Sequence, residues 1–166
     1  AGVIETGIML IIVMRLASIG IWPSIARRLG SRSALALAYL TCAIATLALP
    51  LAAQASGPAL LMALGLFGLA SGGVTVVGWA VLSEVLGAGD PRDRDTAYTA
   101  AFGLFTMSMK VALGLSAALV GGWLAVSGVS VGVPAEQLQL LCRSVACMTV
   151  AAAAWIAIAH PAPGLP

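Results

Sequence analysis

Residues 7–32 read GIMLIIVMRLASIGIWPSIARRLGSR, a long run of apolar and small residues that ends in a cluster of arginines. An α-helix of about 20 residues spans the ~30 Å hydrocarbon core of a bilayer. Arg15 is the one charged residue inside this run, and the pair Arg27–Arg28 ends it. The stretch therefore predicts a membrane-spanning helix over residues 7–26, followed by a basic loop.

Further stretches of the chain have the same length and apolar character. A turn at Gly57–Pro58 and a polar segment over residues 86–96 separate them, and Pro161 follows the last. None alternates with a period of two, which argues against a membrane β-barrel, whereas helices satisfy their own backbone hydrogen bonds in lipid. We therefore expect an all-α, polytopic membrane helix bundle of about five transmembrane helices, surrounded by membrane lipid. The expected helices cover residues 7–26, 33–53, 58–85, 98–127 and 138–160.

Charge is scarce along the whole chain. Of 166 residues, 8 are Lys or Arg and 6 are Asp or Glu. This is 8% charged, against roughly 25% in an ordinary soluble domain, and it cannot cover a water-exposed surface. The 61% hydrophobic content argues against disorder, and a net charge of +2 provides no basic patch for nucleic acid. The cysteines lack the spacing of a disulfide framework or a metal site: Cys42, Cys142 and Cys147.

The arginines indicate which ends of the helices face the cytoplasm. One group lies between the first two expected helices, and Arg92 and Arg94 lie between the third and fourth, on the same side. Because cytoplasmic loops are rich in Lys and Arg, these loops and the carboxy-terminus are expected in the cytoplasm. A multi-pass protein of the plasma (inner) membrane follows. The odd number of helices, an external first residue and Ala1 in place of Met suggest a portion of a larger bundle.

Two cations fall near the middle of expected helices. They are Lys110 and Arg15, whereas all six acidic residues lie outside the apolar core or near a helix end. Charges at the bilayer centre are costly, and they usually face a cavity or a partner. Three neutralising arrangements are open: acids on further helices, an anionic substrate or lipid, or an uncharged lysine. We favour acids on further helices, and packing is an alternative to function for Arg15.

Small and polar residues form a stripe around Lys110. Its helical face reads Gly103, Thr106, Met107, Lys110, Gly114, Ala117 and Gly121. Such a stripe is typical of a cavity wall or a helix contact and not of a lipid-facing surface. A second stripe, over residues 58–85, carries glycines together with Thr75 and Trp79. Thr106, Thr75 and Trp79 are thus candidate cavity-lining residues, while Trp79 also fits an interfacial belt, as Trp22 does.

Several local strings resemble one superfamily of membrane transporters. Residues 22–32, WPSIARRLGSR, resemble the basic loop between helices 8 and 9 of major facilitator transporters. Residues 81–85, VLSEV, look like the end of helix 10 in the glycoside–pentoside–hexuronide:cation symporters, the melibiose-permease-like branch, where a Leu-Ala-Asp-Val type of sequence is usual. Tyr98 is similar to the aromatic residue that opens helix 11, and KVALGL at residues 110–115 resembles the lysine-bearing part of that helix.

The resemblance covers nearly the whole chain, as helices 8–12 of the twelve-helix major facilitator fold, with the amino-terminal half absent. It implies sugar:cation symport by alternating access, with no resident cofactor and no covalent chemistry. The coupling ion, Na⁺ or H⁺, and most sugar contacts are implied to belong to the absent half. Lys110 is implied to take part in coupling or to pair with acids of that half, which makes the missing half an expected partner.

The resemblance also implies a gate at the cytoplasmic ends of the helices. The basic loop and the region after the third helix would lie there, so salt bridges between them would hold the outward-open state. The alternative is that the arginines only orient the chain in the membrane. The candidate gate residues are Arg27, Arg28, Arg32, Glu84, Arg92 and Arg94.

Other functions stay open beside sugar symport. Another major facilitator transporter, which exports a drug or a metabolite, shares the basic loop, and a small membrane scaffold or subunit shares the composition. An enzyme is not expected, although GLASG at residues 68–72 faintly resembles the serine motif of rhomboid proteases. Ser71 lies near mid-span and His160 at a helix end, so their depths differ by roughly 15 Å, too far for a Ser–His pair.

Overall fold

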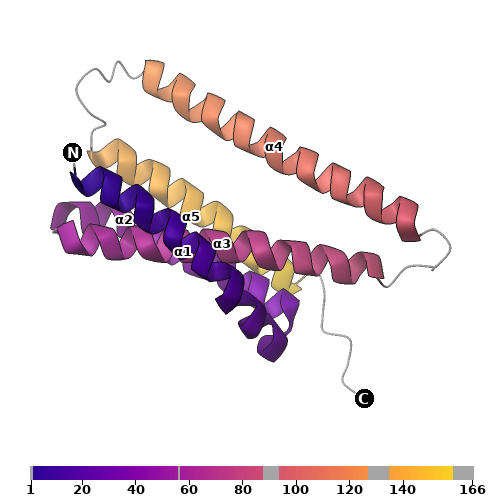
Figure 1. Cartoon of the computed structure of the whole chain (residues 1–166). Helices are drawn as coiled ribbons and strands as arrows, with labels where there is room; N and C mark the ends of the chain where they lie inside the picture. The colour runs from indigo at the N-terminus through magenta and orange to yellow at the C-terminus, as the bar shows by residue number, and fades with distance from the viewer. Residues whose placement is uncertain (1, 56, 88–93, 127–134, 159–166) are drawn as a thin grey trace. The chain divides into compact units, whose positions relative to one another are not determined.

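Five α-helices make up the described chain (Figure 1). The computed structural model describes residues 2–55, 57–87, 94–126 and 135–158. Each helix is long and apolar enough to cross a membrane, and these ranges contain no strand. The expected all-α membrane bundle of five helices is therefore confirmed. The helices are α1 (Gly2–Leu29), α2 (Ser31–Ala55), α3 (Gly57–Gly87), α4 (Arg94–Val126) and α5 (Ala135–Ile158).

Every helix begins one to five residues earlier in the structure than the sequence predicted. The reason is that the prediction followed the apolar residues, whereas helical backbone continues through the polar residues that flank them. The prediction of a basic loop after residue 26 is therefore wrong. Arg27 and Arg28 lie in the last turn of α1, and Arg32 lies in the first turn of α2. The expected ends at Ser127 and His160 lie outside the described residues.

Gly30 alone joins α1 to α2. Its φ of 83° lies in the left-handed region, which glycine adopts without a steric penalty. Its N–H donates to the Ala26 carbonyl at 2.9 Å, and its own carbonyl accepts from the Ala34 N–H at 3.0 Å. One residue therefore ends the first helix and begins the second, so that α1 and α2 form a hairpin with almost no loop.

Gly30→Ala is expected to destabilise the folded chain by roughly 1–2 kcal/mol, because a Cβ in the left-handed region costs about that much. No described atom lies within 4 Å of a Cβ at this position, so no new contact offsets the strain. The measurement is the midpoint of thermal unfolding in detergent. Gly20→Ala is the control, because Gly20 has the same open surroundings inside α1. Equal midpoints for the two variants would contradict the strain at Gly30.

α1 and α3 lie in close contact because α3 presents glycines to α1. A Cβ on Gly68 would lie 2.7 Å from the Ile11 carbonyl oxygen. A Cβ on Gly72 would overlap the hydroxyl of Ser18, which is fully buried. The glycine stripe of α3 is thus a helix contact, in which small residues let two helices approach closely.

Trp22 is a core residue and not the interfacial belt residue that its place near a helix end suggested. Its side chain is 3% exposed, and its indole N–H donates to the Leu69 carbonyl of α3 at 3.0 Å. The ring fills the notch at Gly73, where any Cβ would overlap it. The contact between α1 and α3 therefore turns Trp22 inward. The buried residues of its cluster are Ala34, Leu35, Ala38 and Val77.

The chain divides into two units. The first, over residues 1–81 and 135–166, holds α1, α2, most of α3, and α5, which lie side by side in Figure 1. Within it, α2 packs against both α1 and α5. The second unit, over residues 82–134, holds the end of α3 and all of α4. The small buried side chains on α2 and α5 include Ala43, Ala45, Ala52, Cys142, Ala146 and Ala153.

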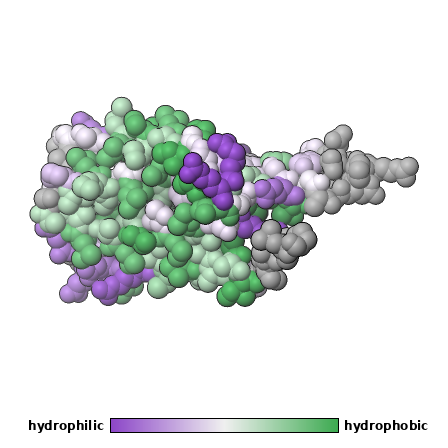
Figure 2. Space-filling model, turned by 90° about the horizontal axis from the view of Figure 1, so that it is seen from below, coloured by the Kyte–Doolittle hydropathy of each residue, from purple (hydrophilic) through white to green (hydrophobic). Residues whose placement is uncertain are grey.

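Apolar side chains cover much of the outer surface. Figure 2 shows hydrophobic residues in green over most of the visible face, with hydrophilic residues gathered in a few patches. On α1, for example, Ile12, Leu16 and Ile19 are 51%, 62% and 58% exposed. A surface of this kind is stable against lipid or against further apolar helices, and not against water.

Candidate functional site

Lys110 lies at the centre of the apolar part of α4. That part runs from Tyr98 to Gly122, so twelve residues separate Lys110 from either end. At a rise of 1.5 Å per residue, the lysine is about 18 Å from both ends. Its side chain is exposed, and it makes no hydrogen bond or ion pair with the other described residues of its unit. Lys110 is therefore a cation at the middle of an apolar helix.

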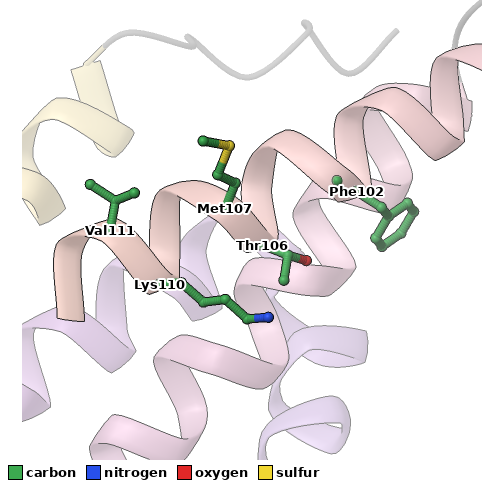
Figure 3. Close-up of a pocket in the computed structure, with 6 residues that line it drawn as sticks. Phe102, Thr106, Met107, Lys110 and Val111 are labelled. Carbon is green, nitrogen blue, oxygen red and sulfur yellow. The ribbon is translucent and has the colours of Figure 1, made fainter. Parts of the chain in front are cut away.

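An open hollow of about 510 Å³ surrounds Lys110 on α4 (Figure 3). Figure 3 shows Lys110, Thr106 and Phe102 pointing to one side of the helix, while Met107 and Val111 point to another. Each row follows the four-residue spacing of a helix face. The cation and the Thr106 hydroxyl therefore share one row, beside an apolar one. The residues that line the hollow are Phe102, Gly103, Thr106, Met107, Lys110 and Val111.

Aromatic contacts hold the beginning of α4 to the end of α3 within the second unit. The Tyr98 hydroxyl donates to the Ser83 carbonyl at 3.3 Å. The Tyr98 ring stacks on Phe102, with 6.1 Å between the ring centroids. Phe102 also lines the hollow. Its stacking on Tyr98 therefore holds in place one end of the row formed by Phe102, Thr106 and Lys110.

Arg15 and Thr75, which the sequence placed on two separate helices, line one groove between α1 and α3. The groove has a volume of about 290 Å³. A Cβ on Gly72 would lie 3.1 Å from Arg15 Cγ, so the stem of the arginine lies against the bare backbone of α3. Arg15 is exposed and Thr75 half-buried. The lining residues are Ile12, Arg15, Leu16, Ser18, Ile19, Gly72, Thr75 and Val76.

The hydroxyl groups in this groove donate to backbone carbonyls of their own helices. The Ser18 hydroxyl donates to the Arg15 carbonyl at 2.6 Å, and the Thr75 hydroxyl donates to the Ser71 carbonyl at 3.1 Å. A hydroxyl whose proton is used in this way still offers its oxygen as an acceptor. The groove therefore presents the donors of a guanidinium beside the acceptor oxygen of Thr75.

Comparison of the sequence with models of known protein families identifies the family of this chain. A family model described as MFS/sugar transport protein matches residues 3–161, nearly the whole chain. The chain belongs to this family. No curated protein and no solved structure matches it. Membership confirms the major facilitator resemblance and points to a transporter and not an enzyme.

In this MFS/sugar transport protein, the basic residues of the expected gate lie at the joint between α1 and α2. Arg27 and Arg28 are exposed in the last turn of α1, where cations interact favourably with the helix dipole. An Nη of Arg27 donates to Ser24 Oγ at 3.0 Å. Arg32, in the first turn of α2, is half-buried. The structure thus brings the three basic gate candidates to one end of the first unit.

The remaining gate candidates, Glu84, Arg92 and Arg94, belong to the second unit. Glu84 is exposed in the last turn of α3. Arg94 is the first residue of α4, and its side chain lies outside those described, as does the whole of Arg92. Pairing across the gate therefore stays a prediction.

Two neighbours of Arg15 were missed as site residues, and one candidate lies beside the groove. Ser18 follows Arg15 by three residues, which is the spacing of one helix face, and Gly72 precedes Thr75 by three residues on the glycine stripe of residues 58–85. Trp79 follows Thr75 by one turn on α3 and is half-buried. It does not line the groove with Arg15 and Thr75.

Proposed function

We propose that this chain is the carboxy-terminal membrane portion of a sugar:cation symporter that works by alternating access. Membership in the MFS/sugar transport family supports transport. The observation that carries cation coupling is the exposed Lys110 at the centre of α4, in a row with Thr106 and with no acid at mid-helix in the sequence. A cation held at this depth needs a partner, because an unpaired charge in hydrocarbon is costly.

In this proposal, the partners are carboxylates on helices of an amino-terminal half. A coupling ion, Na⁺ or H⁺, binds the same carboxylates and so competes with the Lys110 ammonium. Binding of the ion releases the lysine and changes which of the two access states is more stable. Two rocking halves around a midplane site are the precedent for such a cycle. In this proposal, the row of Lys110 and Thr106 on α4 lines the substrate cavity.

The protein would cross the plasma (inner) membrane with its arginine-bearing joint in the cytoplasm. The positive-inside rule supports this orientation, because Arg27, Arg28 and Arg32 gather at one end of the first unit. Arg92 and Arg94 follow an even number of crossings later and would lie on the same side. Pairing between this basic end and Glu84 would hold the outward-open state.

The test is uptake by the complete gene product in proteoliposomes, with labelled melibiose, glucose, xylose and glucuronate, under an imposed Na⁺ or H⁺ gradient. Symport predicts accumulation above the external concentration that collapses when an ionophore dissipates the gradient. Uptake that only equilibrates, whatever the gradient, would overturn cation coupling. Expulsion of a drug or metabolite without sugar uptake would instead identify an exporter of the same superfamily.

Neutralising both Arg27 and Arg28 is expected to change the cytoplasmic accessibility of the cavity by about two- to thirtyfold. Surface ion pairs contribute about 0.2–1 kcal/mol each, and two of them are removed. The readout is the rate at which a cavity cysteine, introduced at Thr106, reacts with a thiol reagent on the cytoplasmic side. Arg143→Gln, which removes an exposed arginine on α5, is the control. Unchanged transport and accessibility in the double variant would leave the arginines with a role in orientation alone.

A further inference from the structure

A narrow groove of about 180 Å³ lies between α2 and α5, which pack against each other in the first unit (Figure 1). Its residues on α2 are four to eight positions before Ala55, and its residues on α5 are four to eight positions after Ala135. The groove is therefore within about 12 Å of one end of both helices, opposite the joint at Gly30. The lining residues are Leu47, Pro50, Leu51, Gln139, Cys142 and Arg143.

Polar side chains form a row on α5 along this groove. Gln139 and Arg143 line it, and Glu136 precedes Gln139 by three residues and Arg143 by seven, on the same helix face. Through their side chains, these residues form no hydrogen bond or ion pair with the other described residues of the unit. Glu136 and Arg143 are about 10 Å apart along the helix axis, too far to pair directly. The row thus offers a carboxylate, an amide and a guanidinium to a ligand that spans them.

The surroundings of the row are apolar and open. Leu47 and Leu51 are exposed beside it on α2, and Leu140 is exposed on α5. Side chains on a helix point back toward its beginning, so the Arg143 guanidinium extends toward the near membrane surface, as arginines close to the end of a span do. The groove is smaller than the about 300–1,000 Å³ that encloses a complete small molecule. Its occupant is therefore part of a longer molecule along the lipid-facing surface.

The charges of the row match a zwitterionic headgroup. The guanidinium of Arg143 and the amide N–H groups of Gln139 donate to phosphate oxygens. The Glu136 carboxylate only accepts, so it favours a cationic donor and repels a headgroup with net negative charge. A primary ammonium has N–H groups to donate, whereas the quaternary ammonium of choline has none. The row therefore fits phosphatidylethanolamine better than phosphatidylglycerol or phosphatidylcholine.

We propose that the groove between α2 and α5 binds one phosphatidylethanolamine molecule, in the leaflet opposite the basic joint. Its phosphate binds Arg143 and Gln139, its ammonium binds Glu136, and an acyl chain lies against Leu47 and Leu51. This lipid site is separate from the proposed symport and does not depend on it. Free phosphate, an anionic phospholipid and a covering protein helix are the other occupants that the experiment separates.

The test is photolabelling of the complete gene product in nanodiscs, with a trace of phosphatidylethanolamine that carries a diazirine in one acyl chain. Mass spectrometry of peptides maps the labelled positions, which are expected at residues 47–51. Labelling there should be about three- to fivefold stronger in a phosphatidylcholine matrix than in a phosphatidylethanolamine matrix, which competes through one more exposed ion pair. Glu136→Gln should remove this difference. Arg143→Gln should weaken the labelling about tenfold, because it removes charge-assisted hydrogen bonds to the phosphate.

Matched variants separate the site from damage to the fold. Ser144 is exposed on α5 next to Arg143, but its hydroxyl donates to the Leu141 carbonyl and it does not line the groove. Ser144→Ala should therefore keep the full labelling. Arg143→Lys keeps the positive charge and should retain much of the labelling that Arg143→Gln loses. The thermal unfolding midpoint of each variant is measured in the same nanodiscs.

Several results would overturn the inference. Equal labelling of residues 47–51 in the two matrices would remove the headgroup preference, and stronger competition by phosphatidylglycerol would reverse it. Labelling that survives Arg143→Gln would remove the phosphate contact. Competition by inorganic phosphate in the buffer would replace the lipid with a free anion. Labelling of α1 without any label at residues 47–51 would show that protein covers the groove.

Discussion

Replacing Lys110 by glutamine is expected to reduce gradient-driven sugar uptake by roughly 100-fold or more. Removing one partner of a desolvated charge pair costs about 3–5 kcal/mol, which corresponds to at least two orders of magnitude. Lys110 lies at the centre of the apolar part of α4. The acids that the lysine is proposed to neutralise would then be left alone in the membrane. Initial uptake rates of the complete gene product in proteoliposomes, at equal protein content, are the measurement.

A set of variants separates coupling from damage to the fold. Lys110→Arg keeps the charge and should retain part of the uptake. Met107→Leu, one turn away in the neighbouring row of the same hollow, should retain nearly all of it. Equilibrium exchange of sugar across the membrane, without a gradient, should survive better in Lys110→Gln than accumulation does. Full accumulation in Lys110→Gln would remove the lysine from the coupling mechanism.

Replacing Gly73 by alanine is expected to destabilise the protein by about 3 kcal/mol, the upper end of what overpacking a core costs. The added methyl overlaps the indole of Trp22, which is 3% exposed and held by its hydrogen bond to Leu69. The ring cannot move aside without losing both its burial and that bond. The midpoint of unfolding in a denaturing-detergent titration measures the effect.

The control for Gly73→Ala is the same change at Gly20, where no described atom lies within 4 Å of the new Cβ. Gly20→Ala should leave the midpoint unchanged or raise it, because alanine is the better helix former by up to ~1 kcal/mol. Trp22→Leu should partly restore Gly73→Ala, since the two residues occupy the same space and their effects are not additive. Equal effects of the two glycine variants would contradict the close packing of the Trp22 ring against Gly73.

The number and type of the helices follow from the sequence because each apolar stretch is long enough to cross a bilayer by itself. Their ends do not. Residues such as Arg32 and Arg94 are polar enough to end an apolar stretch, yet the helical backbone continues through them. The row that joins Lys110 to Thr106 was also predictable, because it depends on the spacing within one helix.

Contacts between helices were beyond the reach of the sequence. The inward position of Trp22 and the shared groove of Arg15 and Thr75 both depend on how α1 is shifted along α3. That register is set where side chains of α1 pack directly against the backbone of α3, at Gly72 and Gly73. Many such registers are compatible with a helix that carries glycines on several faces, so the spacing alone does not select one.

The one-residue joint at Gly30 also determines how the chain enters the bilayer during synthesis. Consecutive Cα atoms are 3.8 Å apart, so a single residue leaves no slack between α1 and α2. The first helix therefore cannot settle in the lipid while the second still waits in the insertion channel. We expect the two to enter as a pair, with Arg27, Arg28 and Arg32 at their shared end kept on one side of the membrane, because carrying them across would be costly.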